Sequence, residues 1–172
     1  MISNNKNALI ELQHIELELR NNRTQHLRHF VDQYYCYKHN HVNRNGKANW
    51  EGMVWKGFVS AEASKISDRK DVVKEHVIPL KVITKILLDH SIHDDFSLES
   101  IARILDTYLI FATISQREDK LLRDAKLTSK MPCGFWEQGH ALYNDLFARY
   151  KNVGISILDT RKTKNDSYAS YT

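Results

Sequence analysis

Residues 72–79 read VVKEHVIP, and this stretch decides how the chain around it is interpreted. Two valines open it, the charged pair Glu75 and His76 follows, and Pro79 closes it. Valines favour extended backbone, so the stretch predicts a strand that enters the core. Burying a carboxylate and an imidazole costs free energy unless other groups compensate for it. The charged pair therefore needs either a structural partner or a function.

Helices are predicted on both sides of this strand. Apolar residues recur at three- and four-residue steps within 7–37, which fits two helices or one kinked helix. Pro79 suits the first position of a second helical segment, whose apolar face runs up to Asp89. Ser97 is placed to cap a further helix, with Phe96 and Ile101 as a hydrophobic staple.

A second strand and another helix follow. The segment LIFATI (109–114) is short, apolar and rich in strand-favouring residues. Ser115 and Glu118 then have the spacing of a capping box and predict that a helix begins there. If the two strands pair, this helix start approaches the end of the first strand. Consecutive strand residues point to opposite faces, so Glu75 and His76 can share a site only where that strand ends or twists. Pro79 predicts such an ending, and we expect Glu75, His76 and Glu118 at one site.

The predicted fold class is α+β: one mostly helical domain over residues 1–160 with a small two-stranded β element, and a flexible polar tail over 161–172. The 172 residues are 42% apolar and 27% charged, as in ordinary soluble proteins. We find no apolar run of membrane-spanning length and no signal peptide, which favours a cytoplasmic protein without a membrane partner. Cys36 and Cys133 belong to no CxxC motif, so neither a disulfide framework nor a zinc knuckle is supported.

The stretch KEHVIPLK resembles the first half of the signature of HNH endonucleases, the ββα-metal type. That signature has an acid or histidine, then histidine, an aliphatic residue, any residue and proline. In that family the histidine is the general base, the residue before it binds a divalent metal, and a further ligand comes from the helix after the second strand. The resemblance implies His76 as catalytic base, Glu75 and Glu118 as metal ligands, and a ββα-metal-like element with a helical insertion.

The implied chemistry is hydrolysis of phosphodiester bonds in DNA, or less favourably RNA. Carboxylate ligands suit Mg²⁺ or Mn²⁺, and an imidazole titrates near the working pH of a general base. The chain departs from the family in its second strand, where Thr113 is the only polar residue and the usual asparagine is missing. The segments EHVIP, TISQREDKLL, LTSKMP and FARYKNVGI together resemble sequences of uncharacterised bacterial or phage proteins.

Basic residues suggest a nucleic-acid partner. The net charge is +4, and the polar loop HNHVNRNGKAN (39–49) lies between aromatic residues. The candidate contacts to phosphates are Lys38, Arg44, Lys47, Lys74 and Lys81. An exposed loop without a ligand explains the same pattern, and the sequence leaves the oligomeric state open.

Each candidate residue can also be explained by a structural role. Glu75 and His76 can form a partly buried structural pair, and the capping box alone accounts for Glu118. The histidine-rich stretches KHNH (38–41) and DHSIHDD (89–95) are typical of solvated loops, although DHSIHDD could also bind a metal and the KHNH histidines could contact phosphates. Arg149 or Lys151 can complement a helix dipole. Core packing is expected for the aromatic residues Phe135, Trp136, Tyr143, Phe147 and Tyr150. The alternatives to a nuclease are a non-catalytic nucleic-acid-binding or regulatory protein and a protein-interaction module.

Overall fold

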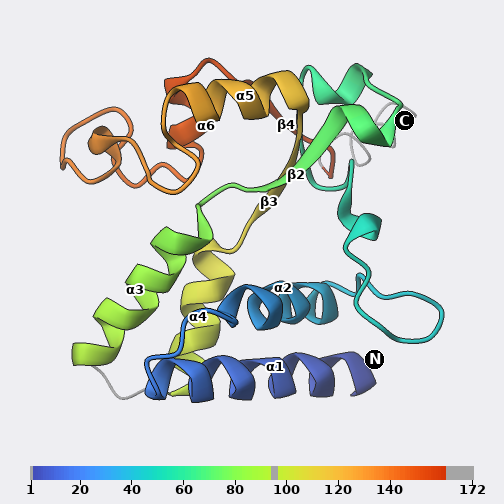
Figure 1. Ribbon diagram of the computed structural model, residues 1–172, viewed down its shortest axis with the longest axis vertical. Coiled ribbons are helices and arrows are strands. Elements are labelled where there is room, and N and C mark those ends of the chain that lie inside the picture. The colour runs from blue at the N-terminus through green and yellow to red at the C-terminus, as the bar shows by residue number, and fades with distance from the viewer. Residues whose placement is uncertain (1, 94–96, 162–172) are drawn as a thin grey trace, which may run out of the picture. The chain divides into compact units, whose positions relative to one another are not determined.

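The computed structural model describes residues 2–93 and 97–161 (Figure 1). These residues form two compact units, and each unit is assembled from two separate chain segments. The first unit contains the chain up to residue 52 together with 80–109. The second contains 53–79 and the chain from 110 onward. We describe each unit separately.

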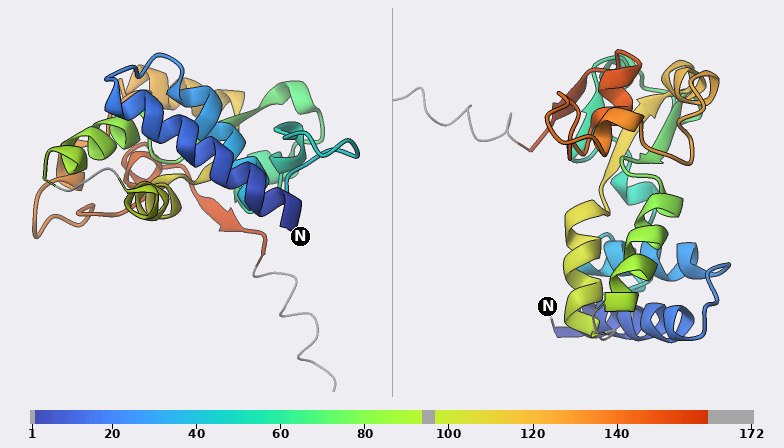
Figure 2. Two further views of the ribbon diagram at one scale, coloured as in Figure 1. Left: turned by 90° about the horizontal axis from the view of Figure 1, so that it is seen from below. Right: turned by 90° about the vertical axis from the view of Figure 1, so that its left-hand side faces the viewer.

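The first unit is helical. Its helices are α1 (Ile2–Arg20), α2 (Leu27–Lys38), α3 (Leu80–His93) and α4 (Leu98–Tyr108). Helix α1 packs against α2 and α4, and α3 packs against α4; Figure 2 shows α1 and α2 side by side. The stretch 7–37 thus forms two helices, and α3 runs past Asp89 into the stretch predicted as a loop.

The helices of the first unit follow the sequence pattern closely. In α1, Leu12, Ile15 and Leu19 recur at three- and four-residue steps and are buried. The predicted cap of α4 is confirmed, because the Ser97 hydroxyl accepts a hydrogen bond from the Ser100 amide at 3.1 Å. The other half of the predicted staple, Phe96, lies outside the described residues.

The second unit contains a four-stranded sheet, larger than the two-stranded element that was expected. The strands β1 (Phe58–Ser60), β2 (Val72–His76), β3 (Phe111–Ser115) and β4 (Ile157–Asp159) lie in the order β2-β3-β1-β4. Strand β3 is antiparallel to β2 and parallel to β1, and β4 is antiparallel to β1. Strands β1 and β4 have three residues each, which is too short to produce a period-two pattern in the sequence.

Short helices complete the second unit. Helices α5 (Gln116–Asp124) and α6 (Ala148–Asn152) are joined by a long connection. Among the described residues there are four 3₁₀ turns: η1 (Glu51–Met53), η2 (Ala63–Lys65), η3 (Arg69–Asp71) and η4 (Cys133–Phe135). Leu122 of α5 and Tyr150 of α6 pack with Ala112 and Ile114 of β3 on one face of the sheet. A second apolar cluster contains Val54, Val59, Ala63 and Val72.

The α+β class with mostly helical content is confirmed. The compactness of the two units does not test the prediction of one domain over residues 1–160. Beyond residue 161, the predicted tail lies outside the described residues. No described helix combines the length and the apolar character needed to cross a membrane.

Candidate functional site

The strands β2 and β3 pair along their full length and lead directly into α5. Val72 faces Ser115 at one end of the ladder, and His76 faces Phe111 at the other. The Val77 amide extends the pairing by donating to the Ile110 carbonyl at 2.8 Å. Ser115 is both the last residue of β3 and the N-cap of α5. The structure therefore contains the strand, strand and helix that were expected to carry Glu75, His76 and Glu118.

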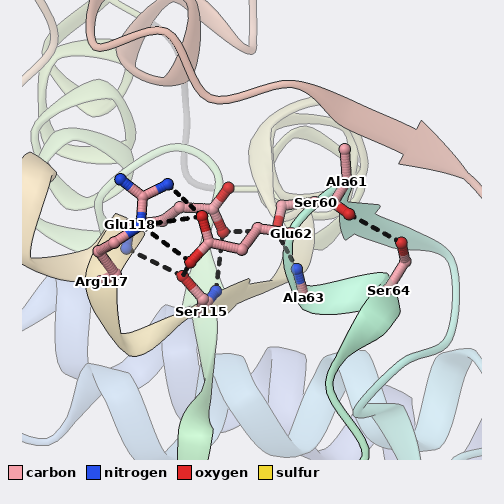
Figure 3. Close-up of polar contacts among 8 residues, drawn as sticks. All are labelled: Ser60, Ala61, Glu62, Ala63, Ser64, Ser115, Arg117 and Glu118. Atoms are coloured by element: carbon pink, nitrogen blue, oxygen red, sulfur yellow. Dashed lines mark hydrogen bonds and ion pairs between the residues drawn. The ribbon is translucent and has the colours of Figure 1, made fainter.

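Glu118 lies in the predicted capping box, which is confirmed. The Glu118 amide donates to the Ser115 hydroxyl at 3.0 Å, and the Ser115 amide donates to Glu118 Oε2 at 2.8 Å. The Ser60 hydroxyl donates to the same carboxylate oxygen at 2.5 Å (Figure 3). Glu118 is only 5% exposed, so these donors compensate for the burial of its charge. Ser60 has no recognisable signal in the sequence, because its contact with Glu118 depends on the unexpected strand β1.

A second carboxylate lies beside Ser115. The Ser115 hydroxyl donates to Glu62 Oε1 at 2.7 Å, and the Arg117 guanidinium binds both oxygens of Glu62 (Figure 3). The hydrogen bond from Arg117, followed by that from Ser115, lowers the pKa of Glu62 below its ordinary value. Ser115 thus joins two acidic side chains, one buried and one near the surface.

Glu75 is paired with a buried arginine. Arg149 Nη2 donates to Glu75 Oε1 at 2.9 Å, and the Arg149 side chain is fully buried. The same guanidinium donates to the carbonyls of Val77 at 3.1 Å, Leu127 at 2.7 Å and His76. Arg149, which the sequence offered with Lys151 as a complement to the dipole of its helix, is thus buried inside the second unit with its charge neutralised by Glu75.

His76 lies on the opposite face of β2 from Glu75. Because the ladder continues through His76, side chains keep alternating there, and Pro79 comes too late to turn both inward. The His76 ring lies 4.4 Å from the Phe111 ring and is 7% exposed. Glu75 shares its face with Ala112, its partner across the ladder, and α5 packs on that face. The structure therefore does not bring His76 together with Glu75 and Glu118.

Tyr150 lies within reach of three negative charges on the α5 side of the sheet. Burial raises its pKa most, and the charges of Glu75, Glu118 and Asp119 raise it further. Its hydroxyl is buried and has no hydrogen-bond partner among the described residues. Sequence reasoning missed Asp119, although its position next to Glu118 in the first turn of α5 was a possible signal.

Each of these carboxylates has one oxygen engaged. Glu75 Oε1 binds Arg149, Glu118 Oε2 binds two serines, and Asp119 Oδ2 binds Arg123 at 2.8 Å. Within residues 2–93 and 97–161, the second oxygen of each has no hydrogen bond or ion pair. We call Glu75, Glu118, Asp119 and the Tyr150 hydroxyl the carboxylate cluster.

The carboxylate cluster offers few protein ligands to a hard cation. In the part of the chain that the structure describes, no group of three or more histidine, cysteine, aspartate or glutamate side chains is arranged to hold a metal ion. Mg²⁺, however, is commonly held by one or two carboxylates with water completing its shell. One or two of the second carboxylate oxygens, with water, are the protein ligands that such an ion would have here.

The five candidate phosphate contacts have different surroundings. Lys38 binds the Tyr34 hydroxyl and the Asp106 carboxylate, which ties α2 to α4. The Lys74 ammonium lies 5.2 Å from the centre of the Phe111 ring. Arg44, Lys47 and Lys81 are exposed and form no ion pair among the described residues. Of the four candidates on the first unit, Arg44, Lys47 and Lys81 are therefore more available to a phosphate than Lys38, which is already paired with Asp106.

The aromatic residues of 135–150 and the histidine-rich stretches differ in their surroundings. Phe135 and Tyr150 are buried as expected, but Trp136 and Tyr143 are 55% and 43% exposed, so their assignment to the core is wrong. In KHNH, the rings of His39 and His41 lie against Tyr35. In DHSIHDD, residues 94 and 95 lie outside the described residues.

Comparison of the chain with protein-family models, with curated proteins and with solved structures finds no match.

Proposed function

We propose that this protein is a metal-dependent nuclease that hydrolyses phosphodiester bonds in DNA, and less favourably in RNA. The observation that supports it is the carboxylate cluster beside the paired strands β2 and β3 and the helix α5 that follows β3. A buried hydroxyl without a hydrogen-bond partner is costly, and a bound Mg²⁺ or Mn²⁺ ion would compensate for it. When bound, the ion would neutralise charge on the phosphate and on the leaving oxygen.

Within this proposal, Glu75 and the first-turn acids of α5 hold the ion. Arg149 orients Glu75 by occupying one of its oxygens, which leaves the other for the ion or its water shell. Glu118 contributes through Oε1, because its capping contacts occupy Oε2. Asp119 contributes through Oδ1, because Oδ2 binds Arg123. Lys81, Arg44 and Lys47 are candidates for contacts to phosphates.

His76 remains the proposed general base, and its position constrains how a substrate would bind. Strand β2 lies at an edge of the sheet, so Glu75 and His76 flank that edge from its two faces. A phosphodiester lying along the edge would meet Glu75 on one face, and it would reach His76 on the other only if that side chain, 7% exposed, became more accessible. General bases contribute about 10²- to 10⁴-fold to a rate, so His76→Ala should lower nicking by that factor.

The test is nicking of supercoiled plasmid by the purified full chain with Mg²⁺ or Mn²⁺. We expect nicking that EDTA stops, loss of nicking in Glu75→Gln and His76→Ala, and no loss in Glu137→Gln. Glu137 is an exposed acid of the second unit and serves as the matched control. Thermal unfolding of each variant separates loss of activity from loss of folding. Equal nicking by His76→Ala would remove His76 as the base. A wild type that neither nicks DNA nor gains thermal stability with either metal would overturn the enzyme proposal.

A second candidate function is nucleic-acid binding without catalysis. The internal contacts of Glu75 and Glu118 and the buried position of His76 favour it, because all three side chains already have structural roles. This function predicts retention of DNA in EDTA, with affinity that falls steeply as salt rises, and no nicking under any metal condition.

A further inference from the structure

The loop between α2 and η1 is an ordered hairpin. Val42 and Ala48 form an antiparallel bridge, and the Asn43 amide donates to the Lys47 carbonyl at 2.8 Å. The Asn43 side-chain oxygen accepts from the amides of Asn45 at 2.9 Å and Lys47 at 3.0 Å. These bonds fix the tip, so the exposed side chains of Arg44 and Lys47 start from a defined backbone.

The base of the hairpin is fixed on α2. The His41 amide donates to the Cys36 carbonyl at 2.8 Å, and the Asn49 amide donates to the His41 carbonyl at 2.8 Å. The rings of Tyr35 and His41 are nearly parallel, with an interplanar angle of 9° and centroids 6.0 Å apart. Trp50 follows Asn49 directly, so its backbone is held beside α2.

A depression lies beside Trp50 on the first unit. It has a volume of about 410 Å³, and we call it the Trp50 depression. Its lining residues are Gln25, His26, Arg28, His29, Asp32 and Trp50. The volume falls within the range of small-ligand sites, about 300–1,000 Å³.

The polar lining of the depression favours an anion. The Arg28 side chain is 74% exposed, and its Nε lies 3.8 Å from Asp32 Oδ2, which is longer than a hydrogen bond. Donors of this guanidinium therefore remain available to a ligand. The lining contains one arginine, Arg28, and one acid, Asp32, and the exposed cations Arg44 and Lys47 belong to the hairpin that ends just before Trp50.

We propose that the Trp50 depression binds an unpaired nucleotide of single-stranded DNA or RNA. The base stacks on the indole of Trp50, Arg28 binds the adjoining phosphate, and Arg44 and Lys47 bind phosphates further along the strand. An aromatic platform beside cations suits single strands, because only an unpaired base exposes its face for stacking. The proposal rests on nucleic-acid binding, which both candidate functions include, and does not depend on catalysis.

The test is fluorescence anisotropy of labelled oligothymidylate, oligouridylate and a DNA duplex, with the full chain in EDTA. Stacking is worth about 1–3 kcal/mol per base, so Trp50→Leu should weaken single-strand binding by about 5- to 150-fold. Trp50→Phe should retain most of the affinity. Arg28→Gln should reduce the salt dependence by about one phosphate contact. Comparing the two oligonucleotides separates DNA from RNA as the preferred strand.

Arg103→Gln is the matched control, because Arg103 is an exposed arginine of the same unit on α4. Wild-type affinity in folded Trp50→Leu, or an Arg28→Gln effect no larger than that of Arg103→Gln, would overturn the proposal, as would tighter binding of the duplex. If Trp50→Leu does not fold, Arg28→Gln decides alone. Because EDTA suppresses nicking, failure here leaves the metal proposal intact, and Glu137→Gln should bind these oligonucleotides like the wild type.

Discussion

The two units differ in where their paired charges lie. In the second unit, Arg149 is fully buried and Glu118 is 5% exposed, and both are surrounded by hydrogen-bond partners. In the first unit, ion pairs such as Lys85–Asp89 lie at the surface. Losing one partner of a buried pair strands a charge, whereas a surface pair is replaced by water. The second unit therefore uses a buried charge network to fix its backbone, while each described ion pair of the first unit has at least one exposed side chain.

The largest effect is expected from Arg149→Met. This variant leaves Glu75 without its partner and removes the donor to the carbonyls of Val77, Leu127 and His76. The free energy of unfolding should therefore fall by about 3–5 kcal/mol. Urea unfolding followed by circular dichroism measures the change. Lys85→Met removes a surface pair and should change the stability by about 0–1 kcal/mol. Similar effects of the two substitutions would erase the contrast between the units.

Glu118→Gln should have the next largest effect. Gln can still accept from the Ser60 hydroxyl and the Ser115 amide, but these bonds lose the strength that a charged acceptor provides. We expect a loss of about 1–2 kcal/mol in the free energy of unfolding. Ser115→Ala, which removes the other half of the capping box, should cost about 1 kcal/mol. Wild-type stability of both variants would show that the cap contributes little to the second unit.

Tyr150→Phe should have a smaller effect of opposite sign. The hydroxyl is buried without a hydrogen-bond partner among the described residues, so its removal should stabilise the metal-free protein by about 1 kcal/mol. The same variant should show a smaller thermal shift with Mg²⁺ or Mn²⁺ than the wild type. A loss of stability without metal would mean that this hydroxyl has a favourable contact that the cluster geometry does not explain.

The smallest effect concerns pH. Hydrogen bonds from Arg117 and Ser115 hold the pKa of Glu62 below its ordinary value of 4.5. A lowered pKa in the folded state adds stability that is complete above the unfolded-state pKa and is lost as pH falls through the folded-state pKa. Wild type should thus exceed Glu62→Gln in stability at pH 7, and the difference should shrink below pH 4.5 in urea titrations. A difference that grows on acidification would contradict the assigned direction.

Local patterns predicted much of the fold. Periodic leucines and isoleucines indicated the helices, and the caps at Ser97 and Ser115 were confirmed because each depends on residues three positions apart. The strands around Val72 and Ile114 were indicated by β-branched residues. Strands β1 and β4 were missed because three residues carry no periodicity, and their pairing partners are far away in the chain.

The candidate site was harder to predict, because its geometry depends on contacts between distant residues. The contact of Arg149 with Glu75 spans 74 positions, and that of Ser60 with Glu118 spans 58. Glu75 and His76 point to opposite faces of the sheet because the β2–β3 ladder extends through His76. The position of Pro79 did not indicate how far that ladder extends. The exposure of Trp136 could not be predicted either. Adjacent aromatic residues such as Phe135 and Trp136 look alike in the sequence whether they lie in a core or on a surface.

The alternation of chain segments between the units sets an order of assembly during synthesis. Helices α1 and α2 leave the ribosome before α4, against which α1 packs and whose Asp106 accepts a hydrogen bond from Tyr34. Strand β2 similarly waits for β3, whose first residue is Phe111. A nascent chain released near residue 79 would contain incomplete halves of both units, with apolar surfaces open to aggregation.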